Sequence, residues 1–262
     1  MNVLKIMAAF GVCLAVAGCE KASETGASAA RKAVSLGNAA VRKAGQVVGS
    51  GASHFIKGVA EGIDESVAEF KTEEKNMDRT VYSFTVKDRT GGEVSLETYR
   101  GQVLLIVNTA TRCGFTPQYD GLEAMYERLR GSGFELLDFP CNQFGQQAPG
   151  TDDEIHTFCV LNYKTAFPQF AKVDVNGANA APLFRYLTDA AGFEGFPPDG
   201  KLAPILEKML AEADPDYAQK PSIKWNFTKF LIGRDGKVIR RFEPTAPLAD
   251  VEQAIAAALQ AP

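Results

Sequence analysis

The residues best suited to redox chemistry in this chain are its five cysteines, at positions 13, 19, 113, 141 and 159. Cys113 follows the apolar run VLLIVNT (103–109) in the segment TRCGFT, where a strand should turn into a helix. A thiol there faces unpaired backbone N–H groups and the positive end of the helix dipole, which both favour the thiolate. Reduction of a peroxide needs an exposed, activated sulfur of this kind. A buried structural cysteine is the alternative, which the adjacent Gly114 disfavours.

The second cysteine of a Cys-x-x-Cys motif is missing, because Thr116 occupies its position. The sequence therefore disfavours a dithiol exchanger of the thioredoxin type. A partner cysteine elsewhere in the chain is still compatible with this pattern.

The elements that would position Cys113 follow from hydrophobic periodicity. From about residue 81 onward, apolar residues alternate or form continuous runs between helical stretches, and Thr151 and Glu154 form a capping box. We expect strands at 81–86, 103–109, 134–139, 228–233 and 237–242, and helices at 118–130, 152–162, 182–190 and 248–259. The last two strands form a hairpin, and a right-handed crossover joins two parallel strands. This order predicts an α/β domain with a thioredoxin-like fold over residues 79–262.

Residues 193–222 interrupt this pattern with five prolines and a short amphipathic piece from Leu202 to Met209. We expect a surface insertion that serves as an oligomer contact or a partner site. The oligomeric state does not follow from the sequence.

Three separated segments resemble the signatures of one family. NTATRCGFTPQYDGLE (108–123), FPCNQFGQQAPG (139–150) and KWNFTKFLIGRDGKVIRRF (224–242) are similar to the motifs of cysteine-type bacterial glutathione peroxidases. The resemblance covers roughly residues 80–260. It implies a thioredoxin-like fold, and reduction of hydrogen peroxide and of organic or lipid hydroperoxides at the expense of a thiol.

The resemblance also implies roles for single residues. Cys113 takes the place of the peroxide-attacking cysteine, and Gln147, Trp225 and Asn226 take the places of the other catalytic residues. An amide or an indole N–H can hydrogen-bond a thiolate without bringing negative charge near it. No cofactor or metal is expected. The reductant is an external thiol, either a thioredoxin-like protein or glutathione.

Cys159 is the candidate resolving thiol, in the expected helix EIHTFCVLNY. It departs from the two-cysteine enzymes of the plant type, whose resolving cysteine aligns with Val160, and one step along a helix rotates a side chain by about 100°. The resemblance places Cys141 in a signature without a catalytic role, as a packed residue or a backup thiol.

The N-terminus has the pattern of a targeting segment. Residues 1–18 contain one cation, Lys5, before an apolar run shorter than a bilayer span, and they end before Cys19 in the sequence Val-Ala-Gly-Cys. This resembles the lipobox of bacterial lipoproteins, which implies lipidation of Cys19 and attachment to the membrane. We expect a cell-envelope protein facing the periplasm, with the outer membrane favoured because Glu20 follows Cys19. A plain signal peptide is the alternative.

Residues 19–78 form a tether rich in Ala, Gly and Ser. Apolar residues recur at helical spacing, but repeated glycines weaken a helix. An amphipathic helix on the membrane and a flexible spacer both fit this composition.

The chain carries 28 basic and 32 acidic residues, a formal net charge of −4, without the basic excess of a nucleic-acid-binding protein. Beside a peroxidase, two other functions are compatible with a reactive Cys113. One is a redox sensor or relay that passes a disulfide to a partner protein, and the other is a binding protein on an inactive peroxidase fold.

Overall fold

The computed structural model describes residues 79–198 and 201–261. The expected signal peptide, Cys19 and the tether lie outside the described residues. The described chain belongs to one compact unit, Arg79–Pro262. Within it, no helix combines the length and the apolar character that a bilayer span requires.

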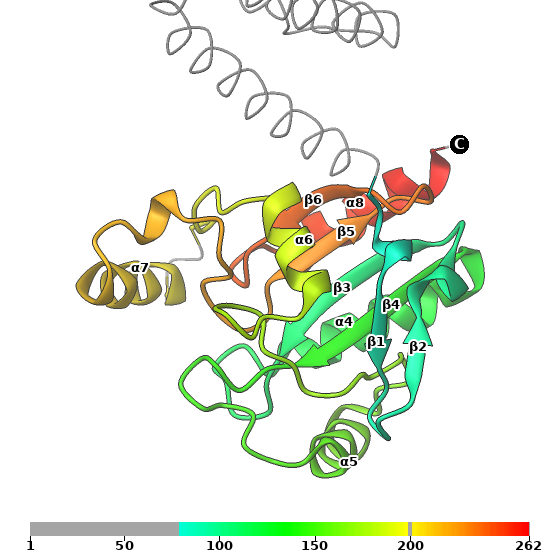
Figure 1. The fold of residues 1–262 in the computed structure, drawn as a ribbon, viewed down its shortest axis with the longest axis horizontal. Coiled ribbons are helices and arrows are strands. Elements are labelled where there is room, and N and C mark those ends of the chain that lie inside the picture. Colours follow the sequence, from blue (N-terminus) through cyan, green and yellow to red (C-terminus); the bar gives the residue numbers. More distant parts are fainter. Residues whose placement is uncertain (1–78, 199–200, 262) are drawn as a thin grey trace, which may run out of the picture. The chain divides into compact units, whose positions relative to one another are not determined.

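A four-stranded sheet forms the centre of this unit, in the order β4-β3-β5-β6 (Figure 1). β3 (Val103–Thr109) and β4 (Phe134–Pro140) are parallel. β5 (Lys229–Ile232) is antiparallel to β3 and forms the expected hairpin with β6 (Val238–Phe242). The thioredoxin-like arrangement predicted from the order of the elements is confirmed.

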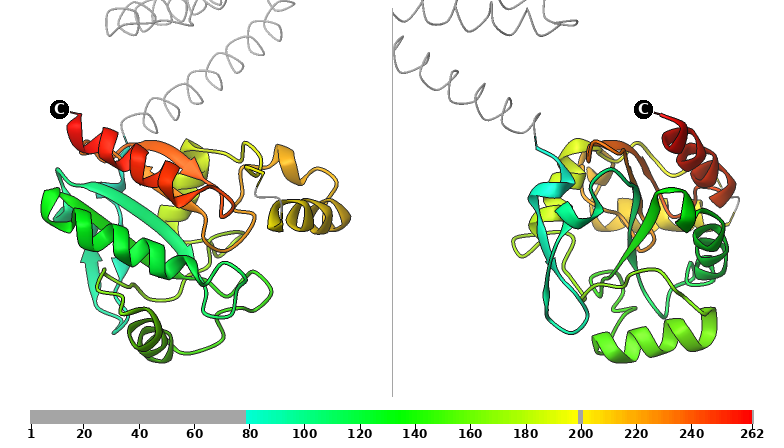
Figure 2. Two further views of the ribbon diagram at one scale, coloured as in Figure 1. Left: turned by 180° about the vertical axis from the view of Figure 1, so that it is seen from behind. Right: turned by 90° about the vertical axis from the view of Figure 1, so that its right-hand side faces the viewer.

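Helices and a hairpin cover both faces of the sheet (Figures 1 and 2). α4 (Gln118–Leu129) and α8 (Leu248–Gln260) cover one face. α6 (Pro182–Ala190) and the hairpin of β1 (Thr85–Lys87) and β2 (Glu93–Ser95) lie on the other.

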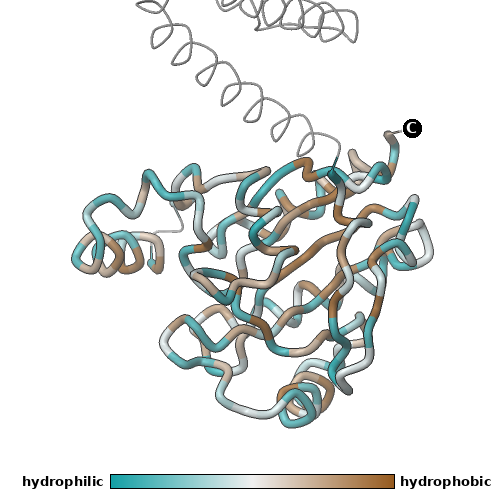
Figure 3. The backbone as a smooth tube through the Cα atoms, viewed as in Figure 1, coloured by the Kyte–Doolittle hydropathy of each residue, from teal (hydrophilic) through white to brown (hydrophobic). Residues whose placement is uncertain are grey.

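This double cover explains the apolar composition of the central strands, which appear brown in Figure 3. Every residue of β3 is buried, and successive side chains enter opposite cores. Leu105 packs on the side of α4 and α8, whereas Leu104 packs with Phe184 of α6.

α5 (Asp152–Tyr163) begins with the expected capping box, in which Thr151 and Glu154 satisfy each other's backbone N–H groups. It ends at Lys164, which has a left-handed backbone with φ +57°.

The expectation of a strand over residues 81–86 was wrong. Val81–Ser83 forms a 3-10 helix, and only the short β1 follows. A strand would point the neighbouring Val81 and Tyr82 to opposite sides, but both are buried in one core cluster. One tight turn allows both side chains to reach it.

The expected insertion contains α7 (Leu202–Ala213), which is longer than the amphipathic piece read from the sequence. Its inner residues Ala203 and Leu206 share a core cluster with Cys113. Leu202 lies beside Gly114, the residue that follows Cys113, because a Cβ atom added to Gly114 would be 3.9 Å from the Leu202 Cδ1 atom. The insertion is therefore more than a surface element, since it packs against the segment that carries the thiol.

Candidate active site

The segment between β3 and α4, here called the cysteine turn (residues 110–117), holds Cys113 in a defined position. The Cys113 N–H donates to Thr116 Oγ1 at 2.9 Å, and that hydroxyl donates to the carbonyl of Ala110 at 2.9 Å. The Phe115 N–H points at the Cys113 Sγ atom at 3.4 Å. Thr116, which replaces the second cysteine of a dithiol motif, thus anchors the turn around the first.

A second segment, here called the donor loop (residues 223–228), precedes β5 and brings two side chains to the sulfur. Hydrogen bonding by the Trp225 indole and the Asn226 amide acts to lower the pKa of Cys113, so both groups lie near its sulfur. Asn108 of β3 fixes this loop, because its Nδ2 atom donates to the Trp225 carbonyl at 3.3 Å and its carbonyl accepts from the Phe227 N–H.

Gln147 joins the same group from the loop after β4. Asn226 Nδ2 donates to Gln147 Oε1 at 3.0 Å, and the Gln147 carbonyl accepts from the Arg112 N–H at 2.9 Å. The Trp225 ring packs against Phe144 of this loop, with ring centroids 5.8 Å apart. The structure therefore brings Cys113, Gln147, Trp225 and Asn226 together in one site.

Two expectations about the thiol itself were wrong. The thiol is buried, since Cys113 is only 8% exposed. It also does not lie at the N-terminus of a helix, because α4 begins at Gln118, five residues later. Burial raises the pKa of Cys113, while the N–H groups of Phe115, Trp225, Asn226 and Gly114 lower it by a smaller amount. The site thus stabilises the thiolate with neutral donors from the turn and the donor loop.

Cys159 lies in α5 and is fully buried, whereas the following Val160 is 38% exposed. Burial and the nearby carboxyl of Asp138 raise the pKa of Cys159 to about 12. Burial also raises the pKa of Cys141 to about 11. All three cysteines among the described residues are free thiols. Cys159 is thus held as a protonated thiol that faces the core.

A buried polar cluster surrounds Asp138 of β4. The only sign of it in the sequence is a single acidic residue within an apolar strand. Thr109 and Tyr119 donate their hydroxyls to the Asp138 carboxyl, and Gln169 Nε2 donates to it at 2.7 Å. Gln169 Nε2 also lies 3.6 Å from Cys159 Sγ. Burial raises the pKa of Asp138 to about 6 despite these donors.

A cavity of about 280 Å³ opens between the cysteine turn and α5. Its lining combines apolar side chains with one cation and one acid: Thr111, Arg112, Pro149, Gly150, Glu154, Ile155 and Phe158. Arg112 directly precedes Cys113, so this cavity leads toward the turn. Within residues 79–198 and 201–261, no group of acids, histidines and cysteines could hold a metal ion.

A buried cysteine with neutral donors, in the turn that follows β3 of a thioredoxin-like sheet, is typical of oxidoreductases that use a thiol. Comparison with known proteins narrows this class. The family profile described as "Glutathione peroxidase" matches residues 81–188. The chain belongs to the glutathione peroxidase family, and is a peroxidase oxidoreductase.

The relatives support this assignment. The "Hydroperoxy fatty acid reductase gpx1" of Synechocystis is 47% identical over 178 residues, covering 66% of this chain and 95% of the relative. A "Glutathione peroxidase homolog" of Neisseria meningitidis is 45% identical over 181 residues, covering 68% and 99%. The crystal structure of T. cruzi GPX1 superposes with a TM-score of 0.50 at 32% identity, covering 69% and 97%.

Proposed function

We propose that the chain reduces hydrogen peroxide and organic or lipid hydroperoxides through a sulfenic acid at Cys113. The observation that carries this proposal is the convergence of two neutral donors, Trp225 and Asn226, on the Cys113 sulfur. Such donors stabilise the thiolate before the reaction and the negative charge that moves to the peroxide oxygens during it.

The proposed first step is a two-electron transfer. The Cys113 thiolate attacks the terminal oxygen of ROOH, the O–O bond breaks, and ROH leaves after taking a proton from solvent. The sulfur is thereby oxidised to a sulfenic acid and the peroxide is reduced to an alcohol, or to water when R is hydrogen.

In the proposed second step the Cys159 thiol condenses with the sulfenic acid, which forms a disulfide and releases water. Cys159 is buried within α5, in the same core cluster as Cys113, and we propose that α5 opens before this reaction. An external dithiol protein or two glutathione molecules then reduce the disulfide by exchange. Intact-mass measurement after one equivalent of peroxide tests this step, because a loss of two hydrogens that maps to Cys113 and Cys159 is expected. A stable sulfenic acid without that disulfide would exclude Cys159.

Replacement of Cys113 tests the whole proposal, with Cys141 as the matched control. We expect Cys113→Ser to abolish consumption of cumene hydroperoxide, and Cys141→Ser to retain it. Peroxide consumption by Cys113→Ser would overturn the proposal. A single turnover that ends in a disulfide with another protein, in place of steady turnover with thioredoxin or glutathione, would instead identify a redox relay.

The N-terminal sequence supports a further part of the proposal. The lipobox-like ending at Cys19 favours a lipid anchor that holds the enzyme at the cell envelope, facing the periplasm, with the outer membrane favoured. A Synechocystis relative carries a name that specifies hydroperoxy fatty acids. Both observations favour lipid hydroperoxides of the adjacent membrane as substrates.

A further inference from the structure

Lys229 is a fully buried lysine at the start of β5, a strand whose residues are all buried. It opposes Val107 of β3 in the sheet register. Burial lowers the pKa of Lys229 to about 7, and the charge of Glu243 opposes this shift. A lysine at such a position is costly unless its amino group makes hydrogen bonds that an apolar residue could not.

The amino group of Lys229 makes two such bonds, to two different parts of the site. Nζ donates to the Phe227 carbonyl at 2.7 Å and to Gln118 Oε1 at 2.8 Å. Phe227 belongs to the donor loop and directly follows Asn226, whereas Gln118 is the first residue of α4. Both the ammonium and the neutral amine keep at least two N–H groups for these acceptors.

The conformation of Phe227 makes the bond to Lys229 informative. Phe227 has φ +69°, a left-handed backbone that a bulky residue adopts only when its surroundings impose it. Its N–H donates to the Asn108 carbonyl on one side, and its own carbonyl accepts from Lys229 on the other. These two bonds fix the two peptide groups on either side of Phe227, the first of which follows Asn226.

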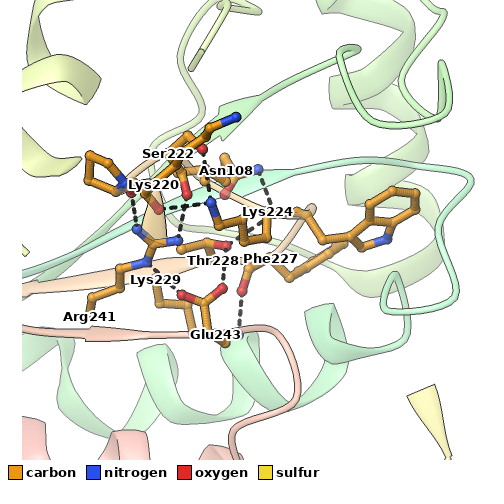
Figure 4. A network of polar contacts seen from close by, with 12 residues as sticks. Asn108, Lys220, Ser222, Lys224, Phe227, Thr228, Lys229, Arg241 and Glu243 are labelled. Carbon is orange, nitrogen blue, oxygen red and sulfur yellow. Dashed lines mark hydrogen bonds and ion pairs between the residues drawn. The ribbon is translucent and has the colours of Figure 1, made fainter. Parts of the chain in front are cut away.

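The surrounding polar network leaves little freedom for this loop (Figure 4). Thr228 Oγ1 donates to the Trp225 carbonyl at 3.1 Å. Arg241 pairs with Glu243 at 2.6 Å and donates to the carbonyls of Pro221 and Ser222. Among these groups, Lys229 reaches across to α4.

Gln118 completes the connection to the thiol. Its N–H donates to the Phe115 carbonyl of the cysteine turn at 2.9 Å, and its Nε2 atom donates to the Pro244 carbonyl at 2.7 Å. Phe115 in turn points its own N–H at the Cys113 sulfur. Lys229, Gln118 and Phe115 therefore form a continuous hydrogen-bonded connection from the donor loop to the Cys113 sulfur.

We propose that Lys229 is a positioning residue for the reaction at Cys113. Its amino group fastens the donor loop to the start of α4, and so sets how closely Trp225 and Asn226 approach the sulfur. This inference rests on the proposed peroxidase function, because it assigns Lys229 a role in the reactivity of the same thiol.

The test compares Lys229→Met, which keeps the length of the side chain and removes the amino group, with Lys237→Met. Lys237 is an exposed lysine on the same hairpin and serves as the matched control. In the full chain, stopped-flow measurement should show a rate constant of Cys113 with hydrogen peroxide at least tenfold lower for Lys229→Met. The Cys113 pKa, taken from the pH dependence of alkylation by iodoacetamide, should rise.

Trp225 is the only tryptophan of the chain, so its fluorescence reports directly on the donor loop. We expect Lys229→Met to shift its emission and the control to leave the emission unchanged. If Lys229→Met lowers only thermal stability, while the rate constant, the Cys113 pKa and the emission stay at wild-type values, the inference is overturned. An unreactive wild-type Cys113 would instead contradict the proposed function itself.

Gln118→Met gives an independent test if Lys229→Met fails to fold, because it removes the acceptor on α4 and leaves the lysine in place. We expect a threefold to tenfold lower rate constant and a shift of the Trp225 emission in the same direction. The two substitutions should be non-additive when combined, since they break the same connection. A wild-type rate in Gln118→Met would contradict the proposed link.

Discussion

At Cys113 two opposing effects set the state of the thiol. Burial raises its pKa, whereas the N–H donors of the cysteine turn and the donor loop lower it. The donors are neutral, so they stabilise a thiolate without forming a permanent ion pair with it. Reactivity therefore depends on the position of these donors, more than on a helix terminus as the sequence suggested.

This balance predicts a pH dependence of the reaction. Because the pKa of Cys113 is raised, the thiolate is the minor form at pH 7, and its fraction grows about tenfold per pH unit well below the pKa. The rate constant with hydrogen peroxide, measured by stopped flow, should rise with pH below the pKa of Cys113.

A charge placed beside the sulfur should change this profile. Asn226→Asp should lower the rate constant at least about tenfold at pH 7, because a carboxylate beside the sulfur raises the Cys113 pKa further. Asn226→Ala, which adds no charge, should shift the profile less. Identical profiles for the two variants would contradict this role of charge.

Asp138 predicts a pH dependence of stability with a defined sign. Its pKa is about 6 in the folded protein, against an ordinary value of 3.8. The folded state therefore binds the proton more tightly, and Asp138 stabilises the protein increasingly as pH falls from about 7 to about 4, with a total effect of about 3 kcal/mol. Urea unfolding should show this gain relative to Asp138→Asn, which has no titrating group here. Parallel curves for the two proteins would contradict it.

At the scale of elements, the sequence correctly predicted the helices and strands that have a strong local pattern. β3 is a continuous apolar run, and the capping box of α5 lies within four residues, so both were correctly predicted. The 3-10 helix at Val81–Ser83 and the packing of α7 beside Cys113 depend on distant contacts, which no local pattern encodes.

The same limit applies to the site. Gln147, Trp225 and Asn226 were found through family motifs, because their meeting with Cys113 joins loops that lie far apart in the sequence. Lys229 carried one signal, a cation inside a buried strand, but its partners Gln118 and Phe227 became visible only in the fold.

The stability of α5 should control how fast Cys159 reacts with the sulfenic acid at Cys113. Thr151→Ala removes the capping bond to the Glu154 N–H and should destabilise the helix by about 1 kcal/mol. If Cys159 reacts only after α5 opens, this change should speed formation of the Cys113–Cys159 disulfide up to about fivefold. Quenched-flow trapping with mass analysis measures that rate. Thr157→Ala, an exposed substitution on the same helix, is the control. An equally faster reaction in Thr157→Ala, or an unchanged rate in Thr151→Ala, would show that disulfide formation does not depend on opening of α5.

At the scale of the whole molecule, the described unit contains the site around Cys113, and the N-terminal 78 residues would attach the protein to a membrane. The relatives match over nearly their full lengths, yet cover only about two thirds of this chain. The match to the family profile begins at residue 81, after the lipobox-like ending at Cys19 and the tether. A lipid anchor would concentrate the enzyme at a membrane surface without changing the reaction at Cys113.

The anchor hypothesis predicts a difference that depends on the substrate. The lipidated chain should reduce phospholipid hydroperoxides in liposomes at least about tenfold faster than a variant that starts at Arg79, because tethering raises the enzyme concentration at the surface. Both should reduce hydrogen peroxide in solution at the same rate, which controls for folding of the shortened chain. Cys19→Ala keeps the tether and loses the lipidation site, so it should behave like the shortened variant on liposomes. Equal rates on liposomes for all three proteins would contradict the hypothesis that a lipid anchor speeds the reduction of phospholipid hydroperoxides.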